Sequence, residues 1–227
     1  MLMRFLTMLS FLPKHFRVSV VFLALFFAET DLSQGAAEAM RGTAAVQSAL
    51  VDFNRKAYDK ALDDLAPALL ADLENAEALN LKGAILTKQQ KYAEALACYN
   101  QALKTSPGFF PARYNIGALL ALRQQWDTAI DYYRNLLIEQ PNNELVEYKL
   151  LLLLLHQNAD SELQAKLFAT DLPTNTPAWY YAKASRLYKR GDPKEAAKYL
   201  EVARNVYGDK TDIFQQELDE SGLNERK

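Results

Sequence analysis

The sequence predicts an all-α fold in which antiparallel helix pairs stack side by side as an α-solenoid. The first observation is a set of residues that recurs after 34 positions in two consecutive segments. The recurring pairs are Gly83 and Gly117, Tyr92 and Trp126, Ala95 and Ala129, Tyr99 and Tyr133, and Pro107 and Pro141. This period is typical of helix–turn–helix units that cannot bury their apolar faces alone. The second observation is that only eight Gly and eight Pro occur, which argues against long flexible linkers.

Composition narrows the class of protein. Half of the 227 residues are hydrophobic and 24% are charged, as in an ordinary globular chain. The net charge of -2 indicates no basic face for nucleic acid, and the absence of long like-charge runs argues against charged tails. We therefore expect no nucleic-acid partner.

The amino-terminal segment 1–37 has the pattern of a secretory signal peptide. Three basic residues, Arg4, Lys14 and Arg17, precede an apolar run over 18–28, and small residues suited to cleavage follow over 33–37. As a helix, the apolar run spans about 16 Å, roughly half of a bilayer core. We therefore expect the segment to be removed and the mature chain to be periplasmic or secreted, in a bacterial-type cell envelope.

Two alternatives stay open for this segment. In one, residues 5–28 remain uncleaved and anchor the protein in the inner membrane, because the earlier apolar stretch lengthens the insertion. In the other, the segment is a buried first helix of the solenoid. Contact with a membrane is expected only if the leader is uncleaved.

The single cysteine, Cys98, excludes an intramolecular disulfide and a cysteine-based zinc site. It lies in a helical pattern between Ala97 and Tyr99, which predicts a small buried thiol. A reactive or intermolecular thiol is the alternative.

The residues that carry the period also give the chain a resemblance to a family. The segments 76–101 and 110–134 resemble tetratricopeptide repeats, with small residues at the eighth and twentieth positions and aromatic residues near the seventeenth and twenty-fourth. Small residues let two helices approach closely, aromatic rings fill the space between them, and proline ends the unit. The resemblance implies a right-handed superhelix that binds other proteins and has no catalytic role.

On this resemblance we expect four to five units and a capping helix. Their bounds are 42–75, 76–109, 110–143, 144–176 and 177–208, with the capping helix and tail over 209–227. In the first unit we expect helices over 44–54 and 57–71, and Pro67 should kink or shorten the second of them.

The fourth unit is degenerate. Its first helix contains six consecutive leucines, Leu150 to Leu155, and a helix that is apolar all round should be buried all round. Asp160 is a plausible N-cap for a second helix that reaches about Ala169.

The fifth unit runs over 177–207, and Pro193 falls at the first turn of its second helix, where proline is tolerated. Beyond it, Ile213, Phe214 and Leu218 are spaced as on one face of a helix over 212–219. We expect this helix to cover the last open groove of the stack.

In the family, the first helix of each unit lines a concave binding surface. The residues that fall at such positions are Asn80, Lys88, Tyr114, Leu122, Tyr148, His156, Tyr181, Tyr188 and Lys189. Between them lie small or apolar residues, Ala84, Ala118, Leu152 and Ser185, which leave room for an extended segment or a helix. A clamp for a chaperone's terminal carboxylate is not supported, because Ala84 and Pro111 stand where polar or basic groups are needed.

Three tyrosines stand out on this surface because they are spaced 34 and then 33 residues apart. Tyrosine is enriched at binding surfaces, since it offers a rigid apolar ring with a polar tip. Our hypothesis is that Tyr114, Tyr148 and Tyr181 anchor a peptide or helix of another protein. The alternative is that the three rings pack within the stack.

No set of catalytic residues is evident. Of the two histidines, His15 lies in the leader and His156 at a helix end, and no Gly-rich phosphate loop or metal-spaced cluster is present. His156 suits either a cap of helix carbonyls or a pH-sensitive contact in the groove. We expect neither an enzyme nor a bound cofactor or metal.

The sequence therefore predicts a protein–protein interaction scaffold in the cell envelope that binds a peptide or helix in its groove. The main alternative is an inner-membrane-tethered accessory subunit of an envelope complex. A third possibility is a carbohydrate or small ligand in the aromatic groove.

Overall fold

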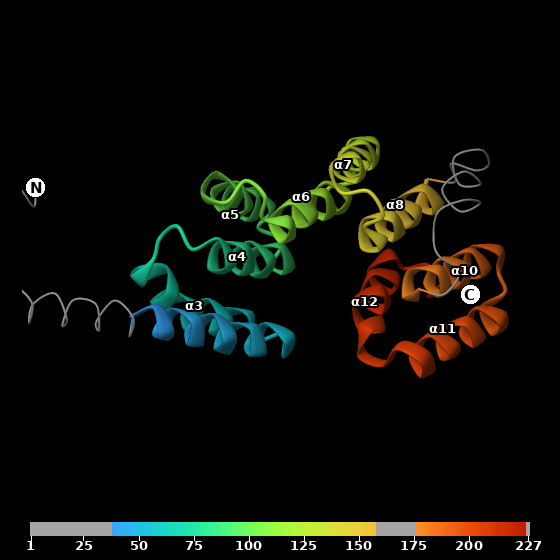
Figure 1. Cartoon of the computed structure of the whole chain (residues 1–227), viewed down its shortest axis with the longest axis horizontal. Coiled ribbons are helices and arrows are strands. Elements are labelled where there is room, and N and C mark those ends of the chain that lie inside the picture. Colours follow the sequence, from blue (N-terminus) through green and yellow to red (C-terminus); the bar gives the residue numbers. More distant parts are fainter. Residues whose placement is uncertain (1–37, 158–175, 226–227) are drawn as a thin grey trace, which may run out of the picture. The chain divides into compact units, whose positions relative to one another are not determined.

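The computed structural model describes residues 38–157 and 176–225. Within these ranges the chain forms helices and turns and no strand, and consecutive helices pack in pairs, which confirms the predicted all-α solenoid class (Figure 1). The predicted leader and the predicted helix from Asp160 to Ala169 lie outside the described residues. The chain divides into two compact units, with the division between Gly108 and Phe109.

The amino-terminal unit contains the helical segment 38–54, α3 (Tyr58–Ala71), α4 (Ala76–Lys88) and α5 (Tyr92–Thr105). Helix α4 packs against both α3 and α5. The core between the first helices is made of small and branched residues: Ala49, Ala61, Leu65, Ala68, Ala78, Leu81 and Ile85. Helix α3 continues through Pro67 to Ala71, so this proline does not shorten it.

The carboxy-terminal unit contains more helices. They are α6 (Phe110–Leu122), α7 (Trp126–Glu139), α8 (Glu144–His156), α10 (Pro177–Arg190), α11 (Pro193–Tyr207), the 3-10 turn η1 (Gly208–Thr211) and α12 (Asp212–Ser221). The side chains of Asn143, Thr176 and Asp192 cap three of these helices, each accepting a hydrogen bond from a backbone N–H of the first turn. Pro193 occupies the first turn of α11, as predicted.

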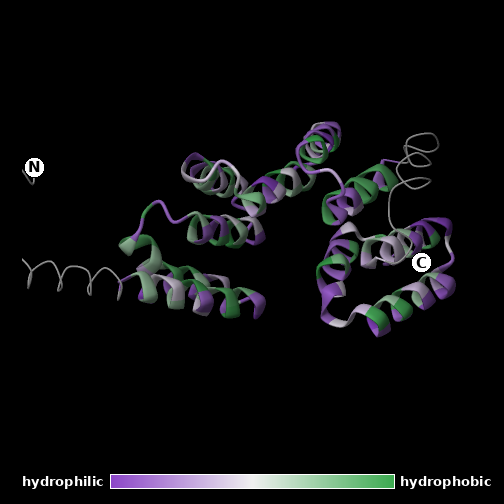
Figure 2. Cartoon of the chain, viewed as in Figure 1, coloured by the Kyte–Doolittle hydropathy of each residue, from purple (hydrophilic) through white to green (hydrophobic). Residues whose placement is uncertain are grey.

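Helix α8 is enclosed by three neighbours. All six leucines from Leu150 to Leu155 are at most 4% exposed, because α7, α10 and α12 each pack against this helix. Hydrophobic residues accordingly extend along α8 (Figure 2). The prediction of a helix buried all round is confirmed.

The turns inside the helix pairs repeat as faithfully as the cores. Lys56, Gln90 and Gln124 are 34 residues apart, and each has a φ between 60° and 62°. The equivalent residue before α11 is Gly191, with a φ of 81°. The backbone N–H of each of these four residues donates a hydrogen bond to the carbonyl three residues earlier. This turn ends the first helix of the pair and reverses the chain.

No helix in the described part of the chain is both long enough and apolar enough to span a bilayer.

Candidate functional site

The three predicted anchor tyrosines lie in the carboxy-terminal unit, and all three are buried. Tyr114 on α6 is 7% exposed, Tyr148 on α8 is 0% exposed, and Tyr181 on α10 is 1% exposed. The helix that covers this region is the chain's own carboxy-terminal helix α12, which packs against α8 and α10. The site is therefore built from the first helices of three units and from α12.

Polar contacts join the tyrosines to α12. The Tyr114 hydroxyl donates to Oε1 of Glu217 at 2.7 Å, and the Tyr181 hydroxyl donates to Oε1 of Gln215 at 3.1 Å. The Tyr148 hydroxyl pairs with the Ser185 hydroxyl at 2.9 Å, within the stack. Two of the three tyrosines thus hold a helix, and the third links neighbouring units.

An aromatic residue of α12 fills the space between the other two rings. The Phe214 ring centroid lies 5.7 Å from that of Tyr148 and 5.8 Å from that of Tyr181. Leu218 and Leu223 are fully buried in the same cluster. Burial of such side chains contributes about 1.5–3 kcal/mol each, so apolar packing stabilises the docking of α12.

A buried ion pair also joins α12 to α8. Lys149 on α8 donates to Oε2 of Glu217, and both side chains are at least nine-tenths buried. Glu217 therefore accepts from an ammonium on one oxygen and from the Tyr114 hydroxyl on the other. Burial, with a further contribution from the negative charge of Glu217, raises the pKa of Tyr114 well above its usual value, so this phenol stays protonated as a donor.

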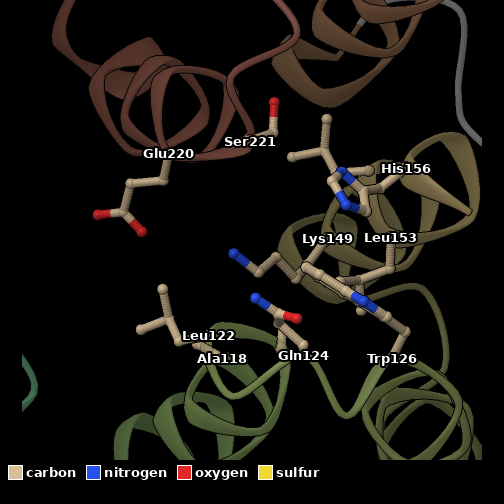
Figure 3. Close-up of a pocket in the computed structure, with 11 residues that line it drawn as sticks. Ala118, Leu122, Gln124, Trp126, Lys149, Leu153, His156, Glu220 and Ser221 are labelled. Carbon is tan, nitrogen blue, oxygen red and sulfur yellow. The ribbon is translucent and has the colours of Figure 1, made fainter. Parts of the chain in front are cut away.

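An open pocket of about 460 Å³ adjoins the carboxy-terminal end of α12. Its lining residues come from α6, α7, α8, α12 and the turn between α6 and α7: Ala118, Ala121, Leu122, Gln124, Trp126, Lys149, Leu152, Leu153, His156, Glu220 and Ser221. The rings of Trp126 and His156 contact each other at one side, with centroids 4.3 Å apart and their planes tilted by 35°. In Figure 3 the amino group of Lys149 points toward the middle of the pocket, between Gln124 and Glu220.

The predicted groove residues therefore fall into several environments. Leu122 and His156 line the open pocket, whereas Tyr114, Tyr148 and Tyr181 lie beneath α12. Tyr188 and Lys189 are half-buried on α10, where Tyr188 packs against the cluster that holds Phe214. Asn80 is half-buried and Lys88 is exposed on α4, in the other unit.

Sequence reasoning did not identify Lys149, Glu217 or Trp126 as part of the site. The repeat pattern indicates only a packing role for Trp126, and Lys149 directly precedes the leucine run, which predicts burial rather than a polar site. The available signal was the spacing within α12, where Glu217 follows Phe214 by three positions and precedes Leu218. Such spacing places the three side chains on one face of a helix.

Comparison with known proteins identifies the repeat. Residues 76–109 match the family model described as Tetratricopeptide repeat. This segment is therefore similar to one tetratricopeptide repeat. In the described ranges, no group of three or more His, Cys, Asp or Glu residues suits a metal ion.

Solved structures extend the tetratricopeptide-repeat fold beyond that segment. A tetratricopeptide repeat protein from Parabacteroides merdae has a TM-score of 0.60 at 19% identity, with 82% of this chain and 71% of that chain covered. Pseudomonas aeruginosa pilF has a TM-score of 0.57 at 19% identity, with 82% and 91% covered. At this identity the likeness shows the fold alone.

A curated relative is similar over a shorter stretch. The uncharacterized protein ycf37 of Cyanophora paradoxa is 35% identical over 71 residues, which cover 31% of this chain and 41% of that protein. The chain therefore spans about two fifths of the length of this relative.

Proposed function

We propose that this protein is a non-enzymatic scaffold that binds a peptide or helical segment of another protein on its carboxy-terminal unit. The binding surface would be the inner face, by which we mean the surface of α6, α8 and α10 that carries Tyr114, Tyr148 and Tyr181. The tetratricopeptide-repeat fold supports a role in protein–protein interaction, because stacked repeats present extended surfaces of this kind. The proposal adds the site and the class of partner to that role.

One observation carries the proposal: an open pocket continues from a surface that already holds a helix. Leu152 and Leu153 give the pocket an apolar part, and Gln124, Lys149 and Glu220 supply polar groups. Leu122 is 48% exposed there. An apolar floor with a few polar groups is typical of sites that take a partner's anchor side chain.

The experiment is capture of partners from an envelope extract, with chemical cross-linking, by the wild-type chain and by Leu122→Glu. A carboxylate in the pocket should abolish binding of the partner, because it would have to be desolvated against apolar residues. Ile138→Glu is the matched control, since Ile138 is 79% exposed on α7 of the same unit and does not line the pocket. A partner that both variants retain, or that both lose equally, would contradict the proposal.

We further propose that the protein works in the cell envelope, either exported with its leader removed or tethered to the inner membrane. This part of the proposal is supported only by the pattern of residues 1–37. Amino-terminal sequencing of the purified protein separates the two forms. A mature chain that begins near residue 38 supports export, and an intact leader in a membrane fraction supports the tethered subunit.

A further inference from the structure

The contact between α12 and the inner face combines apolar packing with an ion pair that apolar packing alone does not require. Phe214, Leu218 and Glu217 lie on the buried face of α12, while Ile213 and Gln216 are exposed on its outward face. Figure 2 shows this mixture of hydrophobic and hydrophilic residues along α12. The inner face thus recognises a helix with an aromatic residue, a carboxylate three positions later, and a leucine directly after it.

The ion pair makes the contact selective rather than simply strong. Replacing a buried ion pair with apolar residues often leaves a protein as stable or more stable, because desolvation offsets the attraction between the charges. Lys149 and Glu217 regain water when α12 departs, which offsets part of the packing that is lost. A carboxylate at this position therefore favours the right helix while keeping the contact reversible.

The covalent connection of α12 also permits departure without loss of the helix pairs. The helix has ten residues and is joined to α11 by the four-residue turn η1. Gly208 opens this turn with a φ of 57°, and no atom lies within 4 Å of the place where a Cβ would stand. Helices of this length are marginal in isolation, so the docked state of α12 depends on its contacts with α6, α8 and α10.

We propose that α12 is an internal competitor, and that the partner is an amphipathic helix of the same pattern, which displaces α12 and binds Tyr114, Lys149, Tyr148 and Tyr181 in its place. This inference rests on the proposed function, because it names the partner's chemistry at the same inner face. Glu220 and Ser221 of α12 form one wall of the open pocket. Departure of α12 removes that wall and joins the pocket to the vacated surface.

A labelled synthetic peptide with the sequence of residues 209–225 tests the proposal by fluorescence polarisation. In the full-length Glu217→Gln variant, the chain's own helix no longer supplies a carboxylate to Lys149, whereas the peptide does. We expect the peptide to bind this variant at least about tenfold more tightly than it binds the wild-type chain, because truncating one partner of a buried charged pair weakens the cis contact by at least that factor. A peptide that carries the same Glu217→Gln change should not show this tighter binding, because it supplies no carboxylate to Lys149.

Two further variants complete the test, one as a second way to weaken the docking of α12 and one as a control. Phe214→Ala weakens the docking of α12 without removing a charge, and it should also increase peptide binding. Gln216→Ala changes a residue on the outward face and should bind the peptide as the wild type does. Circular dichroism confirms that each variant keeps its helices. Peptide binding to Glu217→Gln and Phe214→Ala that is no tighter than to the wild type would overturn the proposal.

Size-exclusion chromatography tests the alternative that α12 of a second copy of the chain occupies the inner face. If the two variants form dimers and do not bind the peptide, the inner face takes α12 of a second copy and the proposal is overturned. The outcomes also separate this inference from the proposed function. If Leu122→Glu loses the partner but Glu217→Gln binds the peptide no more tightly than the wild type, the proposal that α12 is an internal competitor is refuted. The proposed scaffold function then stands. If Glu217→Gln binds the peptide tightly but Leu122→Glu still captures the partner, the proposed role of the pocket is refuted and the proposal that α12 is an internal competitor stands.

Discussion

The ring of Tyr99 lies so close to the backbone of Gly83 that a Cβ atom on Gly83 would stand 2.5 Å from Cε1 of the ring. The same relationship recurs one unit later, where a Cβ on Gly117 would stand 2.6 Å from Cζ of Tyr133. Both tyrosines are at most 2% exposed. The 34-residue period of the sequence is therefore a repeated fit of one ring into the space that a missing side chain leaves.

This fit predicts the effect of Gly83→Ala. The added methyl group should force the Tyr99 ring to move and lower the free energy of unfolding by about 1–3 kcal/mol, even though alanine favours the helix by about 1 kcal/mol. Guanidinium denaturation measures the change. Gly108→Ala is the control, since nothing lies within 4 Å of its Cβ position. Equal stability of the two variants would contradict the account.

The buried ion pair predicts a large cost for Lys149→Met. Glu217 would remain buried, still accepting a hydrogen bond from the Tyr114 hydroxyl but without a cation, which should lower stability by about 3–5 kcal/mol. Lys198→Met removes an exposed pair with Glu195 and should leave stability nearly unchanged, because solvent screens the pair. The double variant Lys149→Met, Glu217→Leu should recover most of the loss in urea denaturation. A single variant as mild as Lys198→Met would show that the pair is not buried in solution.

Alkaline pH should weaken the amino-terminal unit through Tyr99. Burial raises the pKa of Tyr99 to about 12, whereas an unfolded tyrosine has a pKa of about 10. Because the pKa of Tyr99 is higher in the folded state than in the unfolded state, its contribution to the free energy of unfolding is fully present below about pH 10. This contribution is lost as the pH rises toward 12.

The measurement compares the wild-type chain with Tyr99→Phe, which cannot ionise and loses the contact with the Thr87 hydroxyl at 3.1 Å. The difference in unfolding free energy between the two proteins should shrink steadily between pH 9 and pH 11.5. A difference that stays constant over this range would show that Tyr99 titrates normally in the folded protein.

Cys98 should react slowly with a thiol reagent such as Ellman's reagent. Cys98 is half-buried rather than fully buried as its helical pattern predicts, and this partial burial raises the pKa of its thiol, so less of the nucleophilic thiolate is present near neutral pH. We expect a slower reaction at pH 7.5 in the folded chain than in guanidinium. Equal rates in the two conditions would instead favour the reactive thiol considered from the sequence.

Much of the fold follows from the sequence because repeat contacts are local. Gly83, Tyr99 and their counterparts meet over fixed spacings of sixteen residues, so the period reports their packing directly. The burial of Leu150 to Leu155 follows likewise from a helix with no polar face. The left-handed turn residues Gln90 and Gln124 share the period, but glutamine carries no preference for positive φ, and the pattern was not interpreted as a turn signal.

The candidate site depended on contacts that no period encodes. The sequence by itself determined the helix pairs, their close approaches and a terminal helix with one apolar face. Only the tertiary structure decided that Glu217 reaches Tyr114, 103 positions away, and Lys149, 68 positions away. The physical reason is that α12 occurs once, so its docking rests on shape and charge across several helices rather than on a repeated spacing.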